Sequence, residues 1–167
     1  LRGHFMEMGI DASEQIYQAT KAFTENDPQL AKQVLAADTG INDEEINLEK
    51  EALKLMALQQ PVASDFRKII SILKASSDIE RLGDYATHIA RAAIDLNDRG
   101  HNPAIERQIE RMMMIVREML ERVLDAYAHT DEQLAYEVAN EDIQVDMIYV
   151  QQQQAIMTAL TTAGANV

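Results

Sequence analysis

The chain has 167 residues, with 28 acidic and 15 basic side chains, a formal net charge of −13 and no cysteine. The acidic balance disfavours nucleic-acid binding, and the absence of cysteine excludes disulfides, thiolate catalysis and zinc fingers. No apolar run approaches the roughly 20 residues of a membrane span, and the first residues lack the apolar core of a signal peptide, so we expect a cytoplasmic protein.

The first two helices are predicted over residues 5–23 and from Pro28 to about Leu58. The inward stripe of the first consists of Met8, Ile16, Ala19 and Phe23. Between the helices, Asp27 can cap the second one and Pro28 suits its first position. Apolar residues then recur at helical spacing, at Leu30, Val34, Ala37, Ile41, Leu48, Ala52 and Leu55.

Three further helices follow. Pro61 is predicted to open the third, which ends near residues 97–100, and two more are predicted over residues 104–129 and 131–161. The inward positions of the third are Ile69, Ile72, Ile79, Leu82, Ala86, Ile89, Ala93 and Leu96. The fourth contains Met112, Met113, Met114 and Met119. We interpret these methionines as core residues rather than as an adaptable contact surface.

The chain contains a weak internal repeat at an offset of 104 residues, which starts at Asp27 and again at Asp131. The offset places Asp38 on Asp142 and Asn42 on Asp146. We interpret it as a duplicated three-helix unit. The predicted fold is all-α, with tandem three-helix bundles over residues 1–100 and 104–167. We expect the second bundle to comprise only its first two helices within this sequence, so its apolar face favours dimerisation or further residues.

Four oxygen-bearing side chains lie at mirrored distances from Pro61: Asp38 mirrors Asp84, and Asn42 mirrors Glu80. If the chain reverses at that proline, these side chains come level across an antiparallel helix pair. Oxygen ligands at one height on two helices can hold a metal ion. Ordinary solvated carboxylates are the alternative, although like charges four residues apart repel each other unless a cation relieves them.

Two segments carry a family resemblance. Residues 58–67, LQQPVASDFR, and residues 78–86, DIERLGDYA, closely resemble the PhoU family of bacterial phosphate-uptake regulators. The resemblance implies two tandem three-helix bundles with a repeated (Glu/Asp)-x-x-x-Asp motif that binds multinuclear iron or zinc clusters. It also implies restraint of the phosphate ABC transporter and of a phosphate-sensing histidine kinase, often by a dimer.

The family motif can be placed residue by residue. It matches Glu80 with Asp84 on the third helix and Asp142 with Asp146 on the fifth. On the second helix Asp38 is followed by Asn42, whose amide oxygen can bind a metal but brings no charge. His88, one turn beyond Asp84, is expected to be a partly buried, hydrogen-bonded side chain rather than a ligand.

We therefore expect a non-catalytic negative regulator of phosphate uptake. By the resemblance, its partners would be the nucleotide-binding subunit of the phosphate transporter, the sensor histidine kinase and a second copy of the chain. It would reach the inner face of the membrane through these partners, without direct insertion. A di-iron enzyme is disfavoured because no histidine follows a glutamate by three residues. The alternative is a metal-free acidic adaptor, and metal content distinguishes the two.

Overall fold

The computed structural model describes residues 1–95 and 103–129. They form four helices, which are α1 (Arg2–Thr24), α2 (Pro28–Gln59), α3 (Ala63–Asp95) and α4 (Pro103–His129). No strand occurs within these two ranges, so the prediction of an all-α fold is confirmed. The helix predicted over residues 131–161, with Asp142 and Asp146, and the inward position Leu96 lie outside the described residues.

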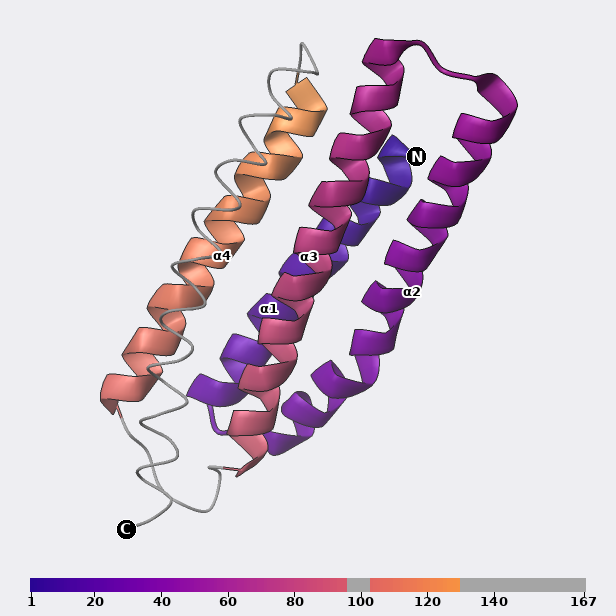
Figure 1. The fold of residues 1–167 in the computed structure, drawn as a ribbon. Coiled ribbons are helices and arrows are strands. Elements are labelled where there is room, and N and C mark those ends of the chain that lie inside the picture. Colours follow the sequence, from indigo (N-terminus) through magenta and orange to yellow (C-terminus); the bar gives the residue numbers. More distant parts are fainter. Residues whose placement is uncertain (96–102, 130–167) are drawn as a thin grey trace.

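α1 is the central helix of the bundle. It packs against α2, α3 and α4, and α2 also packs against α3. In Figure 1, α2 and α3 form a long antiparallel hairpin whose connection lies at the same end of the bundle as the N-terminus, and α4 lies on the other side of α1 from α2. Buried residues of all four helices belong to one hydrophobic cluster. α4 therefore shares its core with the first three helices, while the division at 1–100 and 104–167 stays a prediction.

The inward positions predicted for α1 and for the described part of α3 are all buried. α2 fits less well, because Ala37 is exposed and Leu30 and Leu55 are only partly buried. The reason is position: α2 lies at the edge of the bundle and does not pack against α4. Leu30 and Ala37 face a cleft between α1 and α2 rather than a filled core.

Three of the four methionines predicted for the core of α4 are buried, namely Met112, Met113 and Met119. Met114 is 56% exposed, so the core prediction was wrong at this position. Successive helical residues are about 100° apart, so three in a row cannot all face the same core. Met114 is the member of the run that faces outward.

The break between α1 and α2 follows the predicted capping pattern. The Asp27 carboxylate accepts a hydrogen bond of 3.0 Å from the backbone N–H of Leu30, and Pro28 is the first helical residue. The backbone N–H of Asp27 donates to the Ala22 carbonyl at 2.9 Å. Asp27 thus connects the end of α1 to the start of α2.

We expect Asp27→Ala to lower the free energy of unfolding by about 1 kcal/mol, because the backbone N–H of Leu30 loses its hydrogen-bond acceptor. Urea denaturation measures the change. Asp27→Asn retains a capping oxygen and should unfold close to wild type. Equal losses in both variants would contradict the capping role.

The connection between α2 and α3 differs from the prediction at Pro61. α3 begins at Ala63, and Pro61 lies in the connection. The chain reverses through Gln60, whose φ of 42° is left-handed, and the first turn of α3 closes with a 2.9 Å hydrogen bond from the Phe66 N–H to the Val62 carbonyl. The residues needed for the reversal displace the helix start by two positions.

Across the described ranges, every helix is too short or too polar to span a bilayer.

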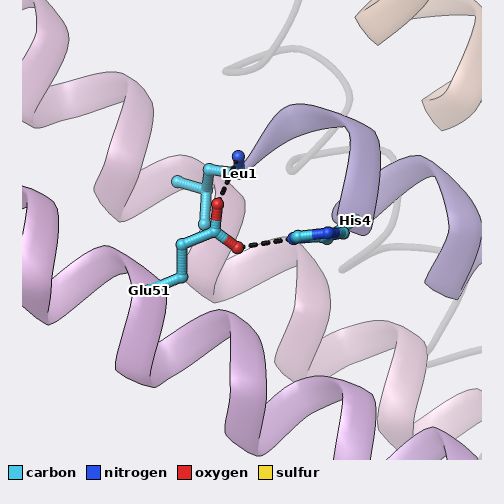
Figure 2. Close-up of polar contacts among 3 residues, drawn as sticks. All are labelled: Leu1, His4 and Glu51. Carbon is cyan, nitrogen blue, oxygen red and sulfur yellow. Dashed lines mark hydrogen bonds and ion pairs between the residues drawn. The ribbon is translucent and has the colours of Figure 1, made fainter.

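Near the same end, the start of α1 is fastened to α2 through Glu51. Figure 2 shows its two carboxylate oxygens directed at the Leu1 amino nitrogen and at His4 Nδ1, at 2.7 and 2.6 Å. The hydrogen bonds from the Leu1 amino group and then from His4 lower the pKa of Glu51. This contact holds the first turn of α1 beside the last third of α2.

Candidate functional site

The α2–α3 hairpin brings Asp38 level with Asp84. A Cβ atom added to Gly83 would lie 3.9 Å from Asp38 Oδ1 and 3.6 Å from Ile41 Cγ2. Because Gly83 has no side chain, α2 can approach α3 closely at the residue that precedes Asp84. The structure therefore places Asp38, Gly83 and Asp84 at one height, as the mirrored spacing about Pro61 predicts.

Glu80 lies one turn from Asp84 and belongs to the same acidic neighbourhood. Burial raises its pKa from an ordinary 4.5 to about 7, and the negative charges of Asp84, Glu45 and Asp38 act in the same direction. A hydrogen bond to Asp84 also favours the protonated form of Glu80. A cation bound here would oppose all of these effects, because it stabilises the ionised carboxylate.

Glu45 is a member of this group that the sequence analysis missed. Burial raises its pKa, and the charges of Glu49 and Asp84 raise it further, against an opposing effect of Arg81. The signal was present, since Glu45 follows Asp38 by seven residues and so lies on the same stripe of α2. The search for acidic pairs four residues apart passed over it. We call Asp38, Glu45, Glu80 and Asp84 the acidic cluster.

Gln15 is a second residue that the sequence did not reveal. It comes from α1, is 6% exposed, and its Nε2 donates to Asp38 Oδ1 at 3.3 Å. Its Oε1 would lie 3.5 Å from a Cβ on Gly83. The available signal was a polar residue next to the inward position Ile16. Through Gln15, the central helix holds the Asp38 carboxylate at the junction of α2 and α3.

The close approach at Gly83 leads to a graded prediction. Gly83→Ala should fit, because its nearest contacts are ordinary van der Waals distances of 3.5 Å and more, and alanine favours a helix by up to about 1 kcal/mol. Gly83→Leu should instead cost about 1–3 kcal/mol, because the side chain must displace Gln15 and Asp38. Urea denaturation ranks the three proteins, and a leucine variant as stable as wild type would refute the close packing.

The acidic cluster suits a metal ion by its donor chemistry, since carboxylate oxygens bind hard and borderline cations. In the conformation described, no three His, Cys, Asp or Glu side chains converge on one coordination centre within residues 1–95 and 103–129. The oxygens are spread over two turns of α2 and α3. Metal binding would thus require the side chains to turn toward a common point, and the ligand roles of Asp38, Glu80 and Asp84 stay predictions.

Two other residues named from the sequence complete the picture. Asn42 is half-buried on α2, between Asp38 and Glu45, and its role as a ligand stays a prediction. His88 is exposed, so the expectation of a partly buried histidine was wrong. It is two residues from both Ala86 and Ala90, which are buried, and two residues correspond to about 200° around a helix. His88 therefore lies on the outer side of α3.

A second acidic group lies on the opposite flank of α2. Burial raises the pKa of Glu44 to about 8, and a hydrogen bond to Asp11 and the charges of Asp11 and Glu7 add to the effect. Glu44 and Asp11 border a cleft of about 540 Å³ between α1 and α2, whose apolar lining includes Val34 and Ile41. These effects favour the protonated form of Glu44, which can share its proton with the Asp11 carboxylate.

Glu44 should make the protein less stable as pH rises. A folded-state pKa of about 8, above the ordinary 4.5, means that the folded chain holds this proton more tightly than the unfolded chain. The associated stability is complete below pH 4.5 and is lost as pH rises toward 8. We expect Glu44→Gln to raise the free energy of unfolding at pH 8, because it removes the repulsion of the Glu44 carboxylate by Asp11 and Glu7. The gain should be about 1 kcal/mol, because solvent screens part of this repulsion. Denaturation at pH 4.5 and pH 8 measures this, and an equal effect at both would contradict it.

Comparison with known proteins supplies the family. The PhoU domain family matches residues 5–93 and 109–166. The phosphate-specific transport system accessory protein PhoU homolog of Pseudomonas putida is 41% identical over 149 residues, which are 89% of this chain and 58% of that protein. The homolog from Pseudomonas aeruginosa is 39% identical over 149 residues, or 89% of this chain and 62% of its own length. The chain thus spans about three fifths of these curated relatives.

The fold agrees with these matches. The crystal structure of PhoU from Pseudomonas aeruginosa superposes with a TM-score of 0.75 at 27% identity, covering 97% of this chain and 95% of that chain. The accessory protein PhoU of Escherichia coli K12 is 33% identical over 149 residues, which are 89% of this chain and 61% of that protein. With both parts of the family profile matched and the helical bundle shared, the chain belongs to the PhoU family.

Proposed function

We propose that this chain is a non-catalytic regulator of phosphate transport. Its relatives are named accessory proteins of a phosphate-specific transport system, which supports the role. The partners we propose are the nucleotide-binding subunit of the phosphate ABC transporter, the phosphate-sensing histidine kinase and a second copy of this chain. Binding to these partners places it at the cytoplasmic face of the membrane and carries phosphate status from transporter to kinase.

The acidic cluster is the proposed regulatory centre, and it binds iron or zinc, including multinuclear clusters. The observation that carries this proposal is the level placement of Asp38 and Asp84 across the hairpin, with Glu80 one turn away. Asp38, Glu80 and Asp84 would hold the metal, with Asn42 and Glu45 beside them. The metal would supply positive charge that lets neighbouring carboxylates ionise together, which fastens α2 to α3. Asp142 and Asp146 are the proposed ligands of a second centre.

Elemental analysis tests the metal centre directly. The protein is purified without chelator or a nickel column, beside Glu80→Ala/Asp84→Ala. Its matched control is Glu118→Ala/Glu121→Ala, which removes two exposed carboxylates from α4. We expect stoichiometric iron or zinc in wild type and control, and its loss in the cluster variant. Wild-type protein that carries no metal and takes up none would refute the centre.

Partner capture tests the regulatory role. The chain is mixed with purified nucleotide-binding subunit, or with the cytoplasmic part of the kinase, and complexes are separated by size. Binding of neither partner would refute the regulatory function, whatever the metal content. The alternative function is a metal-free acidic adaptor, and it is favoured by the absence of a converged ligand group in the described part of the chain. The adaptor predicts that the protein binds its partners equally well with and without metal.

A further inference from the structure

The charge of the chain is divided unevenly along the α2–α3 hairpin. Residues 50–74 carry five of the chain's 15 basic side chains and only two of its 28 acidic ones. The other 142 residues carry ten basic and 26 acidic side chains. This basic segment comprises the last part of α2, the connection and the first part of α3. Figure 1 shows that it forms one end of the bundle. The α2–α3 hairpin of a strongly acidic chain thus has one basic end.

The same end exposes large apolar side chains. We call residues 53–68 the hairpin tip. Leu58 is 72% exposed, Val62 67% and Phe66 45%, and Leu53 on α2 is 62% exposed. These four are half of the large exposed apolar residues in the described part of the chain. Within the described part of the chain they remain exposed, because both helices end here and the connection between them is short.

Both acidic residues of the basic segment already have polar partners. Glu51 contacts His4 and the Leu1 amino nitrogen, and the Asp65 carboxylate lies 3.9 Å from Lys68 Nζ. Lys54 and Arg67 are exposed near the apolar side chains, one on each helix. The hairpin tip therefore presents apolar side chains with net positive charge around them.

We propose that the hairpin tip docks shallowly on an anionic lipid surface. Leu58, Val62 and Phe66 would enter the headgroup region, while Lys54 and Arg67 lie near the lipid phosphates. Exposed apolar side chains flanked by Lys and Arg are the pattern that binds the interface of anionic membranes. This goes beyond the proposed function, because it adds a direct contact with lipid to the proposed contacts with protein partners.

A lipid surface fits the hairpin tip better than a protein groove does. A stable protein interface covers about 800 Å² on each partner, which is more than a few side chains on a convex loop can supply. The acidic remainder of the molecule does not prevent binding. Helices of 32 and 33 residues are about 50 Å long, several times the screening length of about 10 Å at 0.1 M salt. Repulsion of the far end instead orients the bundle with its tip toward the lipid.

Vesicle sedimentation tests the proposal. The chain is mixed with vesicles of phosphatidylcholine alone, or with equal parts of phosphatidylcholine and phosphatidylglycerol. We expect binding to the anionic vesicles only, weakened by salt. Leu58→Gln/Val62→Gln should lower the affinity roughly tenfold or more, because two apolar side chains no longer enter the interface. Lys54→Glu/Arg67→Glu should lower it at least as much.

Two matched control variants keep the result specific to the hairpin tip. Ile10→Gln/Ile46→Gln changes side chains that are 57% and 47% exposed elsewhere on the bundle, and Lys21→Glu/Lys32→Glu reverses the same charges near the other end of α2. Both should bind like wild type, and circular dichroism confirms that every variant remains helical. Equal binding to neutral vesicles, or equal losses in tip and control variants, would overturn the proposal.

Failure to bind any vesicle would also overturn lipid docking. If the tip variants then lost capture of the transporter's nucleotide-binding subunit, the hairpin tip would be a protein contact instead. Glu80→Ala/Asp84→Ala should bind vesicles like wild type, because Glu80 and Asp84 lie 14 and 18 residues beyond Phe66 in α3, which is about four and five helical turns. Lipid docking and the metal centre can therefore fail independently of each other.

Discussion

Glu80→Gln/Asp84→Asn should change the stability of the protein in opposite directions with and without metal. Without metal, the double variant should be more stable than wild type at pH 8 by about 1 kcal/mol, because it removes repulsion that solvent only partly screens. With saturating iron or zinc, wild type should be the more stable protein, because a ligand that binds only the folded chain stabilises it, and the stabilisation grows with the logarithm of the affinity. We expect the variant to lose at least about tenfold to a hundredfold in metal affinity.

The pH dependence of the metal-free protein supports the first half of this prediction. Glu80 has a folded-state pKa of about 7, above its ordinary 4.5, so the folded chain keeps the proton more tightly than the unfolded chain. The corresponding stability is complete below pH 4.5 and is lost as pH rises through 7. The advantage of the double variant should therefore be absent at pH 4.5 and reach its full size above pH 7.

Asp43→Asn is the matched control, because Asp43 is an exposed carboxylate on α2 outside the acidic cluster. Melting temperatures with chelator and with added metal measure both halves of the prediction. If the double variant were destabilised equally in both conditions, the carboxylates would serve packing alone. If metal stabilised wild type and variant alike, its binding site would lie elsewhere.

The sequence predicted most of the fold because the fold depends on helical periodicity and end signals. The inward residues of α1 and α3 recur at helical spacing, and Asp27 with Pro28 is a strong local start signal. The errors fall where tertiary position decides. Ala37 belongs to the apolar stripe of α2 but faces the cleft beside α1, and Pro61 lies in the chain reversal because Gln60 and Val62 are needed to complete it.

The candidate site was predictable only in part. Mirrored spacing about one turn brings Asp38 to the level of Asp84, since an antiparallel hairpin pairs positions whose numbers have a constant sum. Gln15 could not be found in this way, because it belongs to α1 and its contact with Asp38 depends on how three helices pack. Nor can spacing decide whether the carboxylates converge, because that depends on side-chain torsions that a bound cation would change.

Tyr127→Ala should destabilise the whole described bundle by about 3–5 kcal/mol, as the loss of a large buried aromatic side chain usually does. Tyr127 of α4 is 1% exposed, and its ring centre lies 4.4 Å from that of Phe5 in α1. The Arg2 guanidinium donates to the Tyr127 carbonyl, and a Cβ on Gly9 would lie only 2.5 Å from Leu124 Cδ2. α1 and α4 therefore pack closely along much of their contact.

These contacts join the two predicted repeats, so a double-mutant cycle asks whether they unfold as one unit. Tyr127→Ala, Phe5→Ala and the double variant should each unfold in a single transition, and the double variant should cost less than the sum of the two, because neighbouring residues couple. Phe66→Ala is the matched control, since Phe66 is a 45% exposed aromatic residue of α3, outside the contact between α1 and α4. Two separate transitions, with only one moved by Tyr127→Ala, would instead show that α4 belongs to an independent domain that docks on α1.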